Sequence, residues 1–165
     1  MHALFVARSA VLLALAMAVQ MLGLPQLVTG SVVNTVLYLT ALAAPPLYGV
    51  AVGCLTPVIA LLRGILAAPA APLVPFIAVG NGVLVLIFWL FCRRMHWQGR
   101  HVAGVVVASV VKAGWLAVAA GYLVHVPAKL VATMQWPQLV TALIGGAITL
   151  ALLPVLRPWL NRQAS

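Results

Sequence analysis

Long runs of apolar residues, interrupted by Pro, Gly and basic residues, divide this chain into six stretches. A helix that crosses a hydrocarbon core of about 30 Å needs roughly 20 apolar residues, and each stretch is close to that length. The expected spans are about Leu4–Met21, Leu27–Ala44, Pro46–Leu62, Leu73–Phe91, Val102–Val124 and Pro137–Leu156. Only Pro45-Pro46 separates the second span from the third, and no straight helix continues through such a pair. Five spans are therefore the main alternative to six.

The composition indicates a membrane protein. Hydrophobic residues make up 65% of the chain and charged residues 5%, with no Asp or Glu, whereas globular chains are about 25% charged. We therefore predict an all-α integral membrane protein, with residues 1–165 in a single membrane domain. The formal charge of +9 does not indicate nucleic-acid binding, because the basic residues lie at the ends of apolar runs and do not form a water-facing patch.

The basic residues also predict an orientation. Cytoplasmic loops carry an excess of Lys and Arg. With the amino terminus inside, the cytoplasmic side receives Arg8, Arg93, Arg94, Arg100, Arg157 and Arg162. The outer side then receives only Arg63 and Lys129. Both termini are therefore expected in the cytoplasm, and the chain is expected to cross the membrane several times.

The sequence PQLVT occurs twice, as Pro25–Thr29 and as Pro137–Thr141. In the predicted topology both copies lie at the outer surface, and each leads into a helix that runs inward. Proline suits a first helical turn, because its missing N–H would be unpaired there. Two interpretations stay open: the same helix-start solution arose twice, or both copies line one externally open site.

The absence of carboxylate side chains excludes several kinds of chemistry. There is no acidic pair for hydrolysis, no Asp to hold the magnesium of a nucleotide, and no Gly-rich phosphate loop. We therefore expect the chain not to be an enzyme, and in particular not an ATPase; energy for uphill transport would come from another subunit. Cys54 and Cys92 show no metal-ligand spacing, so neither a metal ion nor a cofactor is expected.

Lys112 is the most informative candidate for a binding residue. It lies about 15 Å from the inner end of the fifth span at 1.5 Å per residue. A cation near mid-bilayer costs several kcal/mol unless it is paired, hydrated or snorkelling. The chain holds no acidic partner, so a carbonyl, water, a bound anion or another protein must serve. A hydrated structural lysine and a ligand-facing lysine both fit.

Other polar and aromatic residues are expected in the same outer half of the membrane. Asn81 lies between two glycines of the fourth span, where an interhelical hydrogen bond is the alternative to a ligand contact. The other candidates are Gln135, Trp136, Gln138 and Arg63. For Trp136 the alternative is an interfacial belt residue.

Small residues recur every fourth position of the first span, at Ala10, Ala14 and Ala18. This spacing puts them on one helix face, where small side chains let helices pack closely in lipid. The face serves either internal packing or the docking of another membrane protein.

With these features the chain resembles the substrate-binding S components of energy-coupling factor (ECF) vitamin transporters. The resemblance covers nearly the whole chain. Ala10, Ala14 and Ala18 match the family's Ala-x-x-x-Ala pattern, PFIAVGNGVLVLIF (Pro75–Phe88) looks like its fourth helix, and MQWPQLVTALIGG (Met134–Gly146) looks like its sixth. The resemblance implies six helices, cytoplasmic termini, a ligand site near the outer face, and a first helix that docks on a transmembrane coupling subunit. Two cytoplasmic ATPases would supply the energy.

The predicted substrate is a small anionic or neutral molecule, such as a carboxylated vitamin or vitamin precursor, because Lys112 and Arg63 have no acidic counterpart in the chain. Metal uptake is disfavoured, since the His residues show no ligand spacing. Two other functions stay open: a stand-alone secondary carrier for a small organic solute and a non-transporting membrane scaffold.

Overall fold

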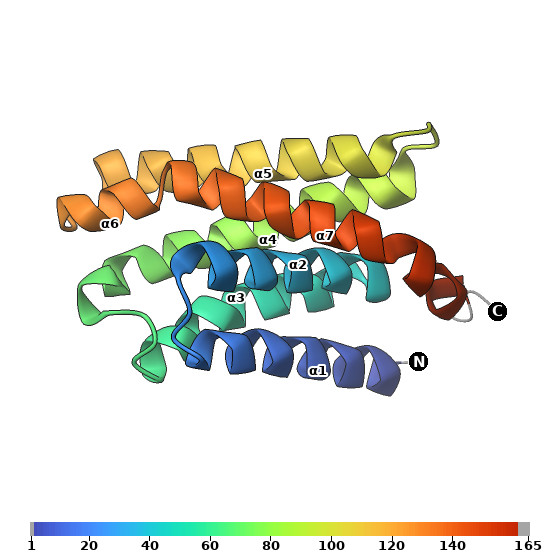
Figure 1. Ribbon diagram of the computed structural model, residues 1–165, viewed down its shortest axis with the longest axis horizontal. Coiled ribbons are helices and arrows are strands. Elements are labelled where there is room, and N and C mark those ends of the chain that lie inside the picture. Colours follow the sequence, from blue (N-terminus) through green and yellow to red (C-terminus); the bar gives the residue numbers. More distant parts are fainter. Residues whose placement is uncertain (1, 162–165) are drawn as a thin grey trace.

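A computed structural model describes residues 2–161 of the chain as a bundle of helices (Figure 1). The α-helices are α1 (His2–Met21), α2 (Gln26–Ala43), α3 (Pro46–Leu62), α4 (Val74–Arg94), α5 (Arg100–Val118), α6 (Ala128–Thr133) and α7 (Trp136–Asn161). A 3₁₀ helix, η1 (Ala68–Leu73), leads into α4, and a π-helical turn, η2 (Ala119–Leu123), continues α5. Arg162, one of the residues used to orient the chain, lies outside the described residues.

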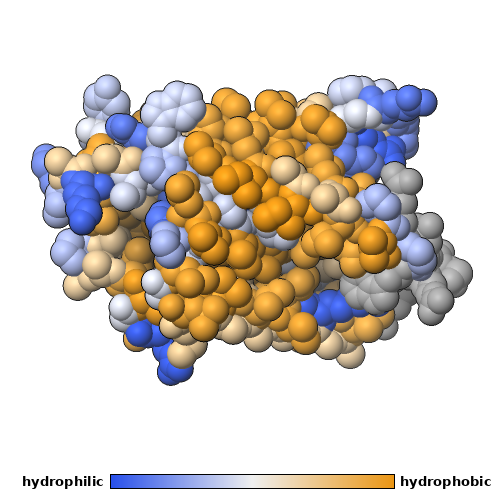
Figure 2. Space-filling view, in the orientation of Figure 1, coloured by the Kyte–Doolittle hydropathy of each residue, from blue (hydrophilic) through white to orange (hydrophobic). Residues whose placement is uncertain are grey.

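The described helices have the length and composition of membrane spans. Five helical stretches are long and apolar enough to cross a membrane, and α3 is a shorter apolar helix of 17 residues. On the face shown in Figure 2, hydrophobic residues cover the middle of the molecule, and most hydrophilic residues gather towards its two ends. The prediction of an all-α integral membrane protein is confirmed. η1, η2 and α6 are short elements that the pattern of apolar runs does not predict.

Helix α2 lies at the centre of the bundle. It packs most extensively against α7 and also contacts α1, α3 and α4, while α4 packs against α3 and α5. Helix α1 begins and helix α7 ends at the same end of the bundle, which also holds the α4–α5 turn (Figure 1). The opposite end holds the α1–α2 turn, the segment from α3 to η1, and α6.

The contact between α2 and α7 is a polar seam. Thr35 of α2 donates a hydrogen bond of 3.2 Å to the carbonyl of Gly145, and Thr149 donates one of 2.9 Å to the same oxygen. The helices approach so closely that a Cβ on Gly145 would lie 2.7 Å from the backbone oxygen of Ser31 and 2.8 Å from the backbone nitrogen of Thr35. Glycine at this position therefore sets the separation of the two helices.

We expect Gly145→Ala to destabilise the protein by about 1–3 kcal/mol, because backbone atoms of α2 must move to admit the methyl group. The measurement is the midpoint of thermal unfolding in detergent. Gly114→Ala on α5 is the matched control, since a Cβ there meets no atom within 4 Å and alanine favours a helix. Equal midpoints for the two variants would contradict the close approach.

Candidate functional site

A cavity of about 420 Å³ lies at the end of the bundle opposite the chain termini. Its walls come from all seven α-helices of the described chain, with α1 contributing Gln20, together with the α1–α2 turn and the segment after α3. The polar side chains in its lining are Gln20, Gln26, Thr29, Asn34, Thr56, Asn81, Lys112, Thr133 and Gln138. Three of the predicted site residues, Asn81, Lys112 and Gln138, therefore line one cavity.

Lys112 reaches the cavity from α5 and is only 3% exposed. Its Nζ donates a hydrogen bond of 2.6 Å to Oδ1 of Asn34 on α2. The partner is a neutral amide oxygen, which satisfies one of the three ammonium protons and leaves the charge uncompensated within this chain. Lys112 is thus neither a snorkelling side chain nor half of an ion pair.

Asn34 is held by both ends of its amide. Nδ2 donates to the carbonyl of Gly30 at 2.9 Å and to Oγ1 of Thr141 at 3.3 Å. Because a lysine ammonium can only donate, Oδ1 must face Lys112, and this fixes the orientation of the amide. Asn34 therefore joins α2 to α5 and α7 and holds the lysine from behind the cavity.

Asn34, which lines the cavity and accepts a hydrogen bond from Lys112, is not among the candidates of the sequence analysis. A signal for Asn34 exists in the sequence. Polar or small residues recur at Gly30, Ser31, Asn34, Thr35 and Tyr38, which is the spacing of one helix face. That face of α2 is buried: Ser31, Asn34, Thr35 and Tyr38 are each at most 7% exposed.

The two PQLVT copies meet at this cavity. Gln26 and Thr29 of the first copy and Gln138 of the second are in its lining. Thr141, the last residue of the second copy, packs beside Gly30, where a Cβ would lie 2.9 Å from its methyl group. Each copy also opens a helix, α2 after Pro25 and α7 around Pro137. The two interpretations of the repeat are therefore compatible.

Asn81 has a structural task in addition to its place in the cavity wall. Pro57 lies inside α3 and has no N–H to donate to the carbonyl of Gly53, four residues earlier. Nδ2 of Asn81 donates to that carbonyl at 3.0 Å. The close approach of α3 and α4 at Gly53, where a Cβ would lie 3.0 Å from that of Asn81, permits this bond. The amide oxygen of Asn81 then remains as an acceptor beside the cavity.

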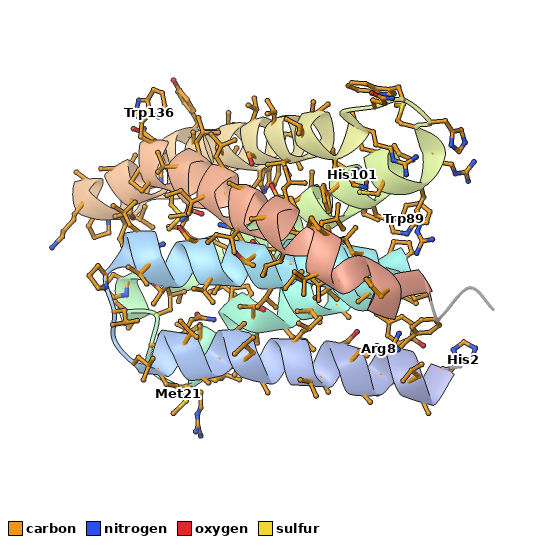
Figure 3. The ribbon with its side chains drawn as sticks, turned by 45° about the vertical axis from the view of Figure 1, so that its right-hand side comes forward. His2, Arg8, Met21, Trp89, His101 and Trp136 are labelled. Carbon is orange, nitrogen blue, oxygen red and sulfur yellow. The ribbon has the colours of Figure 1, made fainter. Side chains whose placement is uncertain are left out.

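Gln135, Trp136 and Arg63 lie at the same end of the bundle but do not belong to the cavity lining. All three are exposed, Trp136 by 73%. Figure 3 shows Trp136 on the outside of the bundle, at the end opposite Arg8 and His101. Contacts between these three residues and a ligand stay predictions.

Helix α1 is the most exposed of the long helices, and within its described residues only Ser9 and Ala16 are buried. Ala10, Ala14 and Ala18 are all exposed on its surface. Internal packing does not account for this stripe of small residues, and a docking role for it stays a prediction.

We expect Asn81→Ala to lower the stability by about 1–3 kcal/mol, because the carbonyl of Gly53 then lacks a donor in a buried position. Thermal unfolding in detergent measures the effect. In the double variant Asn81→Ala/Pro57→Ala, the backbone N–H of residue 57 replaces the lost donor and should restore part of the stability. Additive effects of the two changes would show that Asn81 does not complete α3.

Comparison with known proteins identifies the family. The model of the family described as "ECF transporter, substrate-specific component" matches residues 4–157, nearly the whole chain. No curated protein sequence and no solved structure matches the chain significantly. The family match agrees with the helical membrane fold and with a cavity lined by the polar side chains of several helices. The chain belongs to the family of substrate-specific components of ECF transporters.

Proposed function

We propose that this chain is the binding subunit of an ECF-type importer in a prokaryotic plasma membrane and captures a small vitamin-like solute, anionic or neutral, at the outer face. The observation that carries the proposal is the cavity around Lys112. It lies at the end of the bundle that bears Arg63 and Lys129, whereas Arg8, Arg93, Arg94 and Arg100 belong to the other end. The excess of arginine supports a cytoplasmic position for that other end, and in this orientation the cavity faces outward.

Lys112, Asn81 and Gln138 are the proposed ligand contacts, because they line the cavity and are each at least nine-tenths buried. Asn34 supports them by fixing the position of the lysine ammonium. Gln135, Trp136 and Arg63 remain candidates for contacts at the cavity mouth. They lie at its end of the bundle, and a ligand could reach them without entering deeper.

Transport requires energy that this chain has no group to supply. It contains no carboxylate to hold a nucleotide's magnesium or to relay protons. We therefore assign ATP hydrolysis to two cytoplasmic ATPases and their mechanical coupling to a transmembrane coupling subunit. A stand-alone secondary carrier is the second candidate function, and it predicts transport by the purified chain alone in liposomes.

Helix α1 is the proposed docking face for the coupling subunit. Ala10, Ala14 and Ala18 are exposed at four-residue spacing, and small side chains allow a second membrane helix to approach closely. In lipid such an interface depends on van der Waals fit, so a bulky side chain at its centre should prevent association.

We expect the wild-type chain to co-purify from detergent with its host's coupling subunit and ATPases, and Ala14→Leu to reduce the recovered complex by at least about tenfold, since a bulky group costs 1–3 kcal/mol in a close-packed contact. Ala147→Leu, the same change on the exposed surface of α7, is the control and should retain the complex. If the wild-type chain is folded and monodisperse but never associates with these subunits, the proposal of an ATP-driven importer is wrong and the secondary carrier becomes the favoured function.

A further inference from the structure

The side chains around the cavity fall into three chemical classes, and their distribution restricts the ligand. Among the described lining residues, Lys112 is the single cation and no side chain is acidic or aromatic. The remaining walls are amides and hydroxyls on one hand and aliphatic groups on the other. A ligand must match all three classes.

The single cation in the cavity lining restricts the charge of the ligand. Nζ of Lys112 donates one N–H to Oδ1 of Asn34 at 2.6 Å, and its other two N–H groups can donate to a ligand. A buried ammonium beside a neutral amide is stabilised when an anion enters. One lysine balances one negative charge, and the other cations at this end, Arg63 and Lys129, are exposed and outside the lining. A monoanion such as a carboxylate fits this arrangement, whereas a doubly charged phosphate ester does not.

Two buried amides, those of Asn81 and Gln138, restrict the hydrogen-bonding groups of the ligand. One N–H of Asn81 is donated to the carbonyl of Gly53, which leaves the amide oxygen as an acceptor and the second N–H as a donor. The Gln138 side chain is 8% exposed and makes no hydrogen bond to the rest of the described chain, so it offers both donors and an acceptor. An occupant therefore needs at least one N–H or O–H group in addition to its anionic group.

The apolar walls are aliphatic. The residues are Leu24, Val33, Pro57, Ala60, Ile65, Leu66, Ile77 and Leu130, together with Met134, which adds a thioether but no ring. Trp115, three residues along α5 from Lys112, does not belong to the lining. Its Nε1 donates to the carbonyl of Phe76 at 2.9 Å, and the centroids of the two rings lie 5.9 Å apart. A planar aromatic ligand would therefore find no face on which to stack.

We propose that the ligand is an aliphatic monocarboxylate with at least one hydrogen-bond donor, bound with its carboxylate at Lys112 and its chain among the aliphatic side chains towards Leu24, Ile65 and Leu66. The assignment rests on the proposed role of this chain as a binding subunit. It specifies the substrate class within that role, which the family match leaves open.

The test compares two acids that carry such a donor with their uncharged analogues on the purified wild-type chain in detergent: pantothenate with pantothenol, and biotin with biotin amide. Lipoate with lipoamide provides an aliphatic pair whose acid has no N–H or O–H donor. Nicotinate with nicotinamide provides an aromatic pair, and thiamine an aromatic cation. Isothermal titration calorimetry measures the affinities. We expect at least one aliphatic acid to bind at least about tenfold more tightly than its analogue, since a charge-assisted hydrogen bond is worth 1.5–3 kcal/mol.

Lys112→Met should abolish this difference by removing the charge while keeping the length of the side chain. Lys129→Met, the same change at an exposed cation outside the cavity, should preserve it. The comparison of acid with analogue uses the wild type alone, so it decides the question even if Lys112→Met does not fold.

Three results would overturn the assignment: equal binding of an acid and its uncharged analogue, binding of nicotinate or thiamine in preference to the aliphatic acids, or no binding of any aliphatic acid at millimolar concentration. None of them removes the role as a transporter subunit, which the co-purification with the coupling subunit tests separately. A complex that forms without acid binding would retain the subunit role and discard the ligand class.

Discussion

A positive charge in the interior of a chain that has no carboxylate constrains the rest of this structure. Lys112 must take its partners from neutral oxygen atoms, and Oδ1 of Asn34 at 2.6 Å is the one that the fold provides. That oxygen is correctly oriented because the amide nitrogen is fixed by Gly30 and Thr141. The packing of α2 against α5 and α7 thus holds the cation, and an unpaired buried charge would be far more costly than the packing itself.

Close helix contacts make this arrangement possible at two levels of the bundle. Gly145 brings α7 against the backbone of α2, and Gly53 brings α3 against α4. At the second contact, Asn81 completes the hydrogen bonding that Pro57 interrupts. In lipid, where water cannot satisfy a free carbonyl, such a repair from a neighbouring helix lets a proline remain inside a spanning segment. The same asparagine also lines the cavity. One side chain therefore completes the hydrogen bonding of α3 and forms part of the cavity wall.

The sequence predicts the helices well because the length of an apolar run is a local property. It also indicates Asn81, Lys112 and Gln138, since an isolated polar side chain in an apolar span needs an explanation. It does not predict which side chains meet: Asn34 and Lys112 are 78 residues apart, and Asn34 and Thr141 are 107 apart. The outward position of Trp136 depends on the rotation of α7 about its axis, and the π-helical turn after α5 has no recognisable residue pattern. Both follow from tertiary packing.

The polar face of α2 has a consequence for the order in which the protein is assembled. Among the five helical stretches that are long and apolar enough to cross a membrane, α2 has the lowest mean hydropathy, 1.3 against 1.9–2.3 for the other four. Asn34 and Thr35 donate hydrogen bonds to Thr141 and Gly145 of α7, which follow them by 107 and 110 residues and therefore leave the ribosome much later. Until then a polar stripe lies inside the bilayer with no partner from that helix, although α1 and α3 can already shield parts of α2 from lipid. The centre of the folded bundle is thus a part whose native contacts can be completed only after α7 has been synthesised.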